Sequence, residues 1–225
     1  MSILTSPGSP HRLRCENMAD EVNSKANPSN APQNPAGALE SLAAAAHTAT
    51  PGLPPVHLWN PPDCGDIGLK ITSNGTWLYQ GSPIGRKPLV RLFSTILRKD
   101  ADGYFLVTPI EKISIEVADA PFMAMEMSVL DGPDGPTLRF RTNVDDEVEA
   151  GPDHPLRFES GPASGIKPYV HVRGGLWALL TRALVYDLVE RAVPIVADGQ
   201  PALGISSGGH VFVIGSQEAE QTWRS

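Results

Sequence analysis

The sequence has few cysteines and no long apolar run. Only Cys15 and Cys64 occur among 225 residues, in regions of different character, so they provide neither a disulfide framework nor a four-cysteine zinc site. No apolar run approaches the roughly 18 residues of a membrane helix, and the N-terminus lacks the profile of a secretory signal. We therefore expect a soluble, cytoplasmic protein without a membrane partner.

Positive charge is also scarce. The 18 Lys and Arg residues are outnumbered by 25 Asp and Glu residues, and the resulting net charge of -7 argues against a nucleic-acid polymer as partner. It does not exclude a small anionic ligand. Because the chain has no GxxxxGK[ST] or GxGxxG signature and no HxxxH or CxxC pair, we expect neither a cofactor nor a metal ion.

The first 57 residues have the composition of a disordered tail. They contain eight prolines among many Ser, Asn, Ala and Thr residues, with too little apolar bulk to offset chain entropy. A short helix is expected only at 38–47, where alanines gather. Met18 opens the segment MADEVN and is a candidate for the true start. A second short tail is expected at 218–225.

The clearest hairpin signal lies at residues 67–80. Apolar residues alternate along 67–71, Asn74-Gly75 favours a two-residue type I′ loop, and 76–80 is the returning strand. The expected face-to-face pairs are Ile71 with Leu78, Thr72 with Trp77, and Lys70 with Tyr79. This register predicts an aliphatic face and, opposite it, an aromatic and polar face that carries Lys70, Trp77 and Tyr79.

A helix is expected after Pro88, on the aliphatic face of the hairpin. Its apolar stripe runs from Leu89 to Leu97 and leaves Arg91, Ser94, Thr95 and Arg98 for solvent. Further strands are expected at 104–108, 113–117, 122–130 and 138–141. The methionines at 123, 125 and 127 are interpreted as core or interface filler, and the acidic residues between 145 and 153 as a solvated loop.

The last third repeats this order of elements. A strand at 169–173 is followed by Gly174-Gly175, a helix at 176–191, and a hairpin formed by 203–206 and 210–214. Since 103–107 and 209–213 both follow a helix, we propose a duplicated unit. The predicted fold is α+β, with two small, mainly antiparallel sheet domains at 58–120 and 121–217, similar cores and one helix each.

The stretch 59–97 also resembles a known family. Its pieces WNP, CGDI, NGTWLYQGSPIGR and LVRLFSTIL, with VRGGL at 172–176 and the later Arg182, resemble the bacterial DUF1285 family of unknown function. The resemblance implies duplicated cores, a C-terminal domain similar to a pleckstrin-homology fold, and a groove between the domains for a nucleotide-like ligand. It also implies a role in signal transduction, but no catalytic residue.

Basic residues at the two expected helix starts suggest an anion site. A cation there is unfavourable for the helix dipole by about 0.3 to 1 kcal/mol, and an anion held between the cation and the helix N–H groups reverses this penalty. Nearby aromatic side chains on strands are suited to stacking a base. The candidate ligand-binding residues are Arg86, Lys87, Trp77, Tyr79, Tyr169, His171, Arg173, Gly174 and Arg182. The alternative is that the arginines pair with carboxylates.

A second cluster consists of Asp63, Cys64 and Asp66. The two carboxylates disfavour a thiolate and raise the expected pKa of Cys64, which argues against a nucleophile. The simpler interpretation is a turn in which both aspartates accept backbone N–H bonds. A metal site at Asp63 and Cys64 would need a distant histidine. For His171 itself, a cross-strand hydrogen bond is the commoner explanation.

Three classes of function remain open. The first is a non-enzymatic signalling protein that binds a small anionic ligand. The second is a protein-interaction module that docks a partner on a sheet edge or on the face carrying Trp77 and Tyr79. The third is a hydrolase that uses Asp66 and His171 as acid and base, which requires the two side chains to converge in one cleft.

Overall fold

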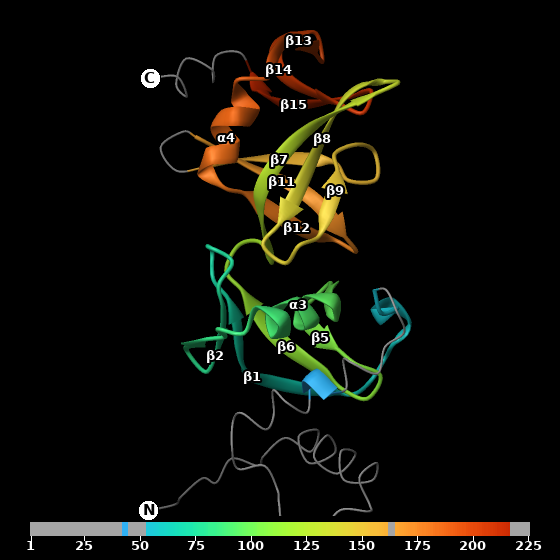
Figure 1. The fold of residues 1–225 in the computed structure, drawn as a ribbon, viewed down its shortest axis with the longest axis vertical. Coiled ribbons are helices and arrows are strands. Elements are labelled where there is room, and N and C mark those ends of the chain that lie inside the picture. Colours follow the sequence, from blue (N-terminus) through green and yellow to red (C-terminus); the bar gives the residue numbers. More distant parts are fainter. Residues whose placement is uncertain (1–41, 45–52, 162–164, 217–225) are drawn as a thin grey trace, which may run out of the picture. The chain divides into compact units, whose positions relative to one another are not determined.

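The computed structural model describes residues 42–44, 53–161 and 165–216. These residues form two compact units: one holds 42–44 and 53–71 with Thr76–Glu116, and the other holds Thr72–Gly75 with 117–161 and 165–216. Each contains one six-stranded sheet (Figure 1). The two units and the third, small sheet confirm the predicted α+β class, with strands predominating over helices.

The two predicted tails lie mostly outside the described residues. This applies to 218–225, to Met18, and to 1–57 apart from 42–44 and 53–57. Residues 42–44 are helical, within the helix predicted at 38–47, and the side chain of Leu42 is buried.

The first unit is built from two antiparallel meanders with a helix between them in sequence. Its strand order is β3-β2-β1-β6-β5-β4. The elements are η1 (Val56–Leu58), β1 (Asp63–Ile71), β2 (Trp77–Tyr79), β3 (Ser82–Pro83), α3 (Lys87–Thr95), β4 (Leu97–Asp100), β5 (Gly103–Val107) and β6 (Lys112–Val117).

The β1–β2 hairpin differs from its predicted register by one residue. Ile71 lies opposite Trp77, and Lys70 lies opposite Leu78. Gly75 N donates to Thr72 O at 2.9 Å, and Gly75 has a φ of 78°, whereas Asn74 is not among the residues with positive φ. A type I′ loop needs positive φ at both central residues, so that prediction is wrong.

This register turns Trp77 into the core. Its side chain is only 2% exposed and its ring lies 6.4 Å from the ring of Phe93 on α3. The helix therefore packs on the hairpin face that carries Ile71, as predicted, but this face also carries Trp77, which was expected on the opposite one. The proposed grouping of Trp77 and Tyr79 with Lys70 on an open face is wrong, because Lys70 lies on the opposite side.

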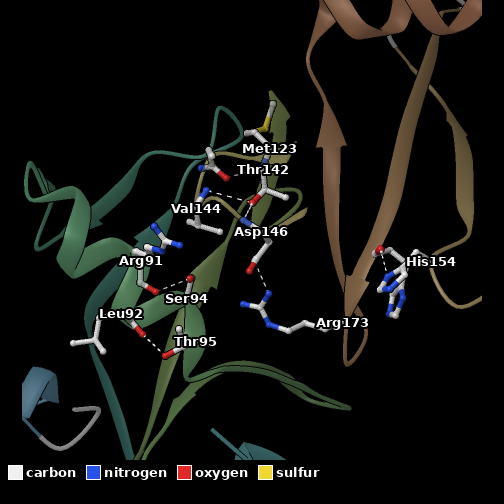
Figure 2. A network of polar contacts seen from close by, with 12 residues as sticks. Arg91, Leu92, Ser94, Thr95, Met123, Thr142, Val144, Asp146, His154 and Arg173 are labelled. Atoms are coloured by element: carbon white, nitrogen blue, oxygen red, sulfur yellow. Dashed lines mark hydrogen bonds and ion pairs between the residues drawn. The ribbon is translucent and has the colours of Figure 1, made fainter. Parts of the chain in front are cut away.

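The helix α3 is shorter than the apolar stripe suggested. It ends at Thr95, and Leu97 and Arg98 belong to β4. Ser94, which was expected in solvent, is buried, and its Oγ donates to Arg91 O at 2.7 Å. Thr95 Oγ1 donates to Leu92 O at the same distance, and such bonds to helical carbonyls compete with continuation of the helix (Figure 2).

The second unit contains a six-stranded sheet, one helix and a three-stranded sheet. Figure 1 shows α4 beside β7 and β11. The sheet orders are β10-β11-β12-β7-β8-β9 and β13-β14-β15. The elements are β7 (Phe122–Gly132), β8 (Gly135–Thr142), β9 (Glu147–Glu149), β10 (Leu156–Ser160), β11 (Ile166–Arg173), β12 (Leu176–Leu180), α4 (Arg182–Val189), β13 (Val193–Ala197), β14 (Gln200–Ser207) and β15 (His210–Ser216).

The two six-stranded sheets have the same topology. Each consists of two three-stranded antiparallel meanders, and in each the first strand of the first meander lies beside the last strand of the second. The duplication is therefore confirmed. Its predicted basis is wrong, because β5 corresponds to β11, whereas residues 209–213 lie in the third sheet.

The segment 176–191, predicted as one helix, is a strand followed by a helix. Leu176, Ala178 and Leu180 are buried on one face of β12, and α4 begins after Thr181. Gly174 and Gly175 both have positive φ, 49° and 77°, as a tight two-residue hairpin loop requires. The helix propensity of Leu and Ala obscured a period of two.

Two smaller expectations also change. Glu147–Glu149 is a strand, and Glu149 pairs with Arg139 at 2.7 Å, so the acidic segment is not simply a solvated loop. The methionines do lie on a strand, but Met125 is 51% exposed and is not core filler. The third sheet is anchored by buried Ser207, whose Oγ accepts from Leu138 N and donates to Ala150 O, both at 2.8 Å.

Candidate ligand-binding face

One face of β10, β11 and β12 gathers aromatic and cationic side chains. Lys167, Tyr169 and His171 alternate along β11 and therefore point to the same side. Arg157 lies opposite Tyr169, and Trp177 lies opposite His171. We call these five residues the aromatic–cation face.

Arg157 is held by the two aromatic rings. Its guanidinium carbon lies 4.8 Å from the centroid of the Tyr169 ring and 4.5 Å from that of Trp177. Its described charge partner is Glu159, at 3.1 Å, and the two side chains are 44% and 48% exposed. An exposed ion pair of this kind contributes about 0 to 1 kcal/mol. The two rings thus orient the guanidinium, while its ion pair with Glu159 is weak.

Tyr169 and Lys167 share the carboxylate of Asp119. The phenol donates to Asp119 Oδ1 at 2.8 Å, and Lys167 Nζ forms an ion pair with Oδ2. Burial raises the pKa of Tyr169, and the hydrogen bond to Asp119 raises the pKa of Lys167. Both groups therefore keep their protons at neutral pH, and this cluster supports the face rather than proton transfer.

His171 is occupied by backbone groups. Its Nδ1 lies 3.0 Å from Asp153 O, and Gly175 N donates to its Nε2 at 3.3 Å. These contacts assign the proton to Nδ1. A second histidine, His154, places its Nδ1 3.1 Å from His171 O. Backbone hydrogen bonding, as expected for a structural histidine, leaves His171 poorly suited to act as a base.

Arg173 does not stand at a helix start. It ends β11, and its guanidinium pairs with Asp146, as Figure 2 shows. The guanidinium carbon also lies 5.1 Å from the centroid of the Phe122 ring. The second basic helix start is therefore wrong, and the alternative of a carboxylate partner is confirmed. Gly174 belongs to the hairpin turn.

The other candidates are dispersed. Arg86 is the N-cap residue of α3, Lys87 is its first residue, and both are exposed. Arg182 begins α4 and donates to Tyr186 Oη at 2.9 Å. Tyr79 is half-buried and its hydroxyl accepts from Gln80 Nε2 at 3.3 Å.

The aspartate cluster lies in β1. Asp63 Oδ1 accepts from Gly65 N at 2.8 Å, and Asp66 Oδ1 accepts from Gly68 N at 2.7 Å, so the predicted bonds to backbone N–H groups are confirmed. The predicted turn ahead of the strand is wrong, because both aspartates belong to the strand Asp63–Ile71. Cys64 lies between them in β1, with its Sγ 3.7 Å from Pro62 O, while Cys15 lies outside the described residues. Across the described part of the chain, no group of three His, Cys, Asp or Glu side chains is placed to hold a metal ion. Nor is any described helix long and apolar enough to cross a membrane.

The sequence analysis missed Arg157 and Trp177. Leu156 and Phe158 alternate with Arg157 and Glu159, a strand pattern that was available from the sequence. Trp177 was hidden by the wrong assignment of β12 to a helix.

Arg98 in the first unit occupies the place in the sheet that Arg157 occupies in the second, and there a chain segment covers the arginine. Arg98 on β4 lies opposite Phe105 and two residues before Asp100, as Arg157 on β10 lies opposite Tyr169 and two residues before Glu159. Arg98 donates to both oxygens of Asp100, at 2.7 and 2.9 Å, and to two carbonyls. These are Val56 O at 2.8 Å and Trp59 O at 2.7 Å.

The comparisons agree over both units. Residues 54–120 match the N-terminal domain of DUF1285, a domain of unknown function, and 121–214 match the C-terminal domain of DUF1285, a protein of unknown function. The comparison with curated proteins gives no match.

Two crystal structures of DUF1285 family proteins are similar. The one from Silicibacter pomeroyi DSS-3 is 43% identical, with a TM-score of 0.71, and the match covers 80% of this chain and 97% of that one. The one from Shewanella baltica OS155 is 27% identical, with a TM-score of 0.44, covering 55% and 91%. The resemblance seen in the sequence is therefore confirmed, and the chain belongs to the DUF1285 family.

Proposed function

We propose that this protein is a non-enzymatic, cytoplasmic binding protein in signal transduction, and that its aromatic–cation face takes a small anionic, nucleotide-like ligand. The observation that carries the proposal is the state of Arg157. It lies over two rings, and its ion-pair partner among the described residues is exposed Glu159, whereas Arg98 at the matching place has four hydrogen bonds.

The face offers the chemistry that such a ligand needs. A guanidinium presents a planar fork of donors matched to phosphate or carboxylate oxygens, and the rings below keep it oriented. Half-exposed Trp177 supplies a surface on which a base stacks. Lys167 adds positive charge nearby, although Asp119 neutralises part of it. The bound anion displaces Glu159 from Arg157, which costs little because that ion pair is exposed.

A protein-interaction module is the second candidate, and Arg98 favours it. That residue holds a segment of this chain's own backbone through the carbonyls of Val56 and Trp59. Arg157 would hold an extended segment of a partner protein in the same way. The likeness of the C-terminal domain to a pleckstrin-homology fold stays a prediction under either candidate.

Thermal shift of the full chain against nucleotides, dinucleotides and phosphorylated metabolites tests the proposal. A ligand at about 100 times its dissociation constant adds about 2.7 kcal/mol, which raises the melting temperature by several degrees. We expect this rise to disappear in Arg157→Gln and to persist in Arg141→Gln, a control whose arginine is similarly exposed. A rise that survives in Arg157→Gln contradicts the proposed site. No rise with any compound favours the interaction module.

A further inference from the structure

A cavity of about 350 Å³, open to solvent, lies between β7 and α4 and shares no lining residue with the aromatic–cation face. Ligand pockets commonly enclose about 300 to 1,000 Å³, so its size suits a small metabolite. Three of its lining residues, Met127, Ser128 and Val129, come from β7. The others are Asp187 on α4, with Glu190 and Arg191 directly after it.

The three charged side chains in this cavity have no partner among the described residues. Five other described cations of the second unit have carboxylate partners, namely Arg139, Arg141, Arg157, Lys167 and Arg173, whereas Arg182 donates to Tyr186 Oη. Asp187 and Arg191 stand four positions apart, a spacing that joins opposite charges within a helix. Here α4 ends at Val189, so Arg191 is not held at that helical spacing.

The lining selects for a ligand that carries both charges. Arg191 disfavours a simple cation, and the two carboxylates disfavour a simple anion. A primary ammonium matches Asp187 and Glu190, and a carboxylate matches the fork of Arg191. The cavity wall is mostly polar, and its small apolar part is formed by Met127, whose flexible thioether adapts to ligand shape, and by Val129, which is 38% exposed.

We infer that this cavity binds a small zwitterion of the amino-acid type. The ammonium lies against Asp187 and Glu190, the carboxylate against Arg191, and a short apolar side chain against Met127 and Val129. The site uses no residue of the aromatic–cation face and does not depend on the function proposed for it.

The test separates the two charged ends of the ligand. Calorimetric titration of the full chain uses three probes: L-leucine, isoamylamine, which keeps only the amine, and 4-methylpentanoate, which keeps only the carboxylate. We expect saturable leucine binding that is about tenfold tighter than that of either fragment, since a hydrogen bond to a charged group contributes about 1.5 kcal/mol or more.

Matched variants show which side chain binds each charged end of the ligand. Arg191→Gln should weaken leucine about tenfold and leave isoamylamine unchanged, whereas Asp187→Asn should weaken both. Asp198→Asn, an exposed change outside the cavity, is the control. These side chains are exposed, so the variants should keep the wild-type melting temperature. The inference is wrong if leucine does not bind saturably, or if Arg191→Gln binds leucine as tightly as the control does.

Discussion

The two six-stranded sheets share a strand order but present different faces. In the first unit Trp77 is 2% exposed beneath α3, and Arg98 is covered by the segment that contains Val56. In the second unit Trp177 is half-exposed and Arg157 remains 44% exposed. Both sheets bury the apolar side chains of alternating strand residues. The exposure of the tryptophan and the arginine in each unit depends on which additional chain segment covers them.

The helices of the two units also differ in their place in the chain and in the side chains they bury. In the first unit α3 connects the two meanders, and Phe93 carries it onto the sheet. In the second unit α4 follows the last strand of the sheet and buries Leu184 and Leu188 instead. A duplicated sheet has thus acquired different coverings, which explains why the order of helices misled the sequence comparison.

The largest expected difference separates the two tryptophans. Trp77→Ala should cost about 3 to 5 kcal/mol, because it removes a buried ring from the core. Trp177→Ala should cost about 1 to 2 kcal/mol, because it removes a partly exposed ring and its contact with Arg157. Urea unfolding, fitted for each transition that appears, measures both. Equal costs would contradict the contrast drawn between the two faces.

The second largest difference is expected between the stability costs of replacing Arg98 and Arg157. Arg98→Ala should cost about 1.5 to 3 kcal/mol, because it leaves two carbonyls and part of Asp100 without a donor. Arg157→Ala should cost about 1 kcal/mol or less. Hydrogen exchange around residues 56–59 should accelerate only in the Arg98 variant. Faster exchange there in the Arg157 variant would mean that the two positions are not equivalent in role.

Acid and alkali should test the two units separately. Hydrogen bonding from Arg98 lowers the pKa of Asp100, so its contribution is present above the unfolded pKa of about 3.9 and is lost as pH falls through the folded value. Asp119 raises the pKa of Lys167, so that contribution is present below about 10.4 and is lost as pH rises through the folded value. Melting temperatures across pH should flatten on the acid side in Asp100→Asn and on the alkaline side in Asp119→Asn. The reverse assignment would refute this origin of the pH dependence.

The smallest expected effect concerns Glu111 in the first unit. Burial raises the pKa of this carboxyl, and no described residue pairs with its side chain, so its charge is unfavourable at neutral pH. Glu111→Gln should raise the melting temperature slightly at pH 7, and the gain should vanish in acid, where the carboxyl is neutral. Glu159→Gln, at an exposed position, is the control and should change little. A gain that persists in acid would show that desolvation is not its cause.

The sequence was informative wherever local pattern and tertiary packing agreed. The strands around Ile113 and Phe122 and the last hairpin were predicted because alternation and turn residues coincide there. The register at Gly75 was not, because one residue with positive φ gives a different loop from two. The strand at Trp177 was missed because Leu and Ala suit a helix equally well until the neighbouring strands are known.

The candidate site was less predictable than the fold. Tyr169 and His171 were correctly placed on one strand face, but their cationic neighbour came from β10, twelve positions earlier at Arg157. Cross-strand pairing between separate segments determines which charge meets which ring, and a single sequence does not specify it. The helix-start argument failed at Arg173 because the segment that follows, Leu176–Leu180, is a strand and not a helix.

The central claim is that Arg157 is available for an anionic ligand while Arg98 is not. Side-chain Nε–H resonances of both arginines, followed during titration of the full chain with adenosine monophosphate, test this directly. We predict a saturable shift of the Arg157 signal and an unchanged Arg98 signal. A titration in which Arg157 does not move, or in which both signals move together without saturation, would contradict the account.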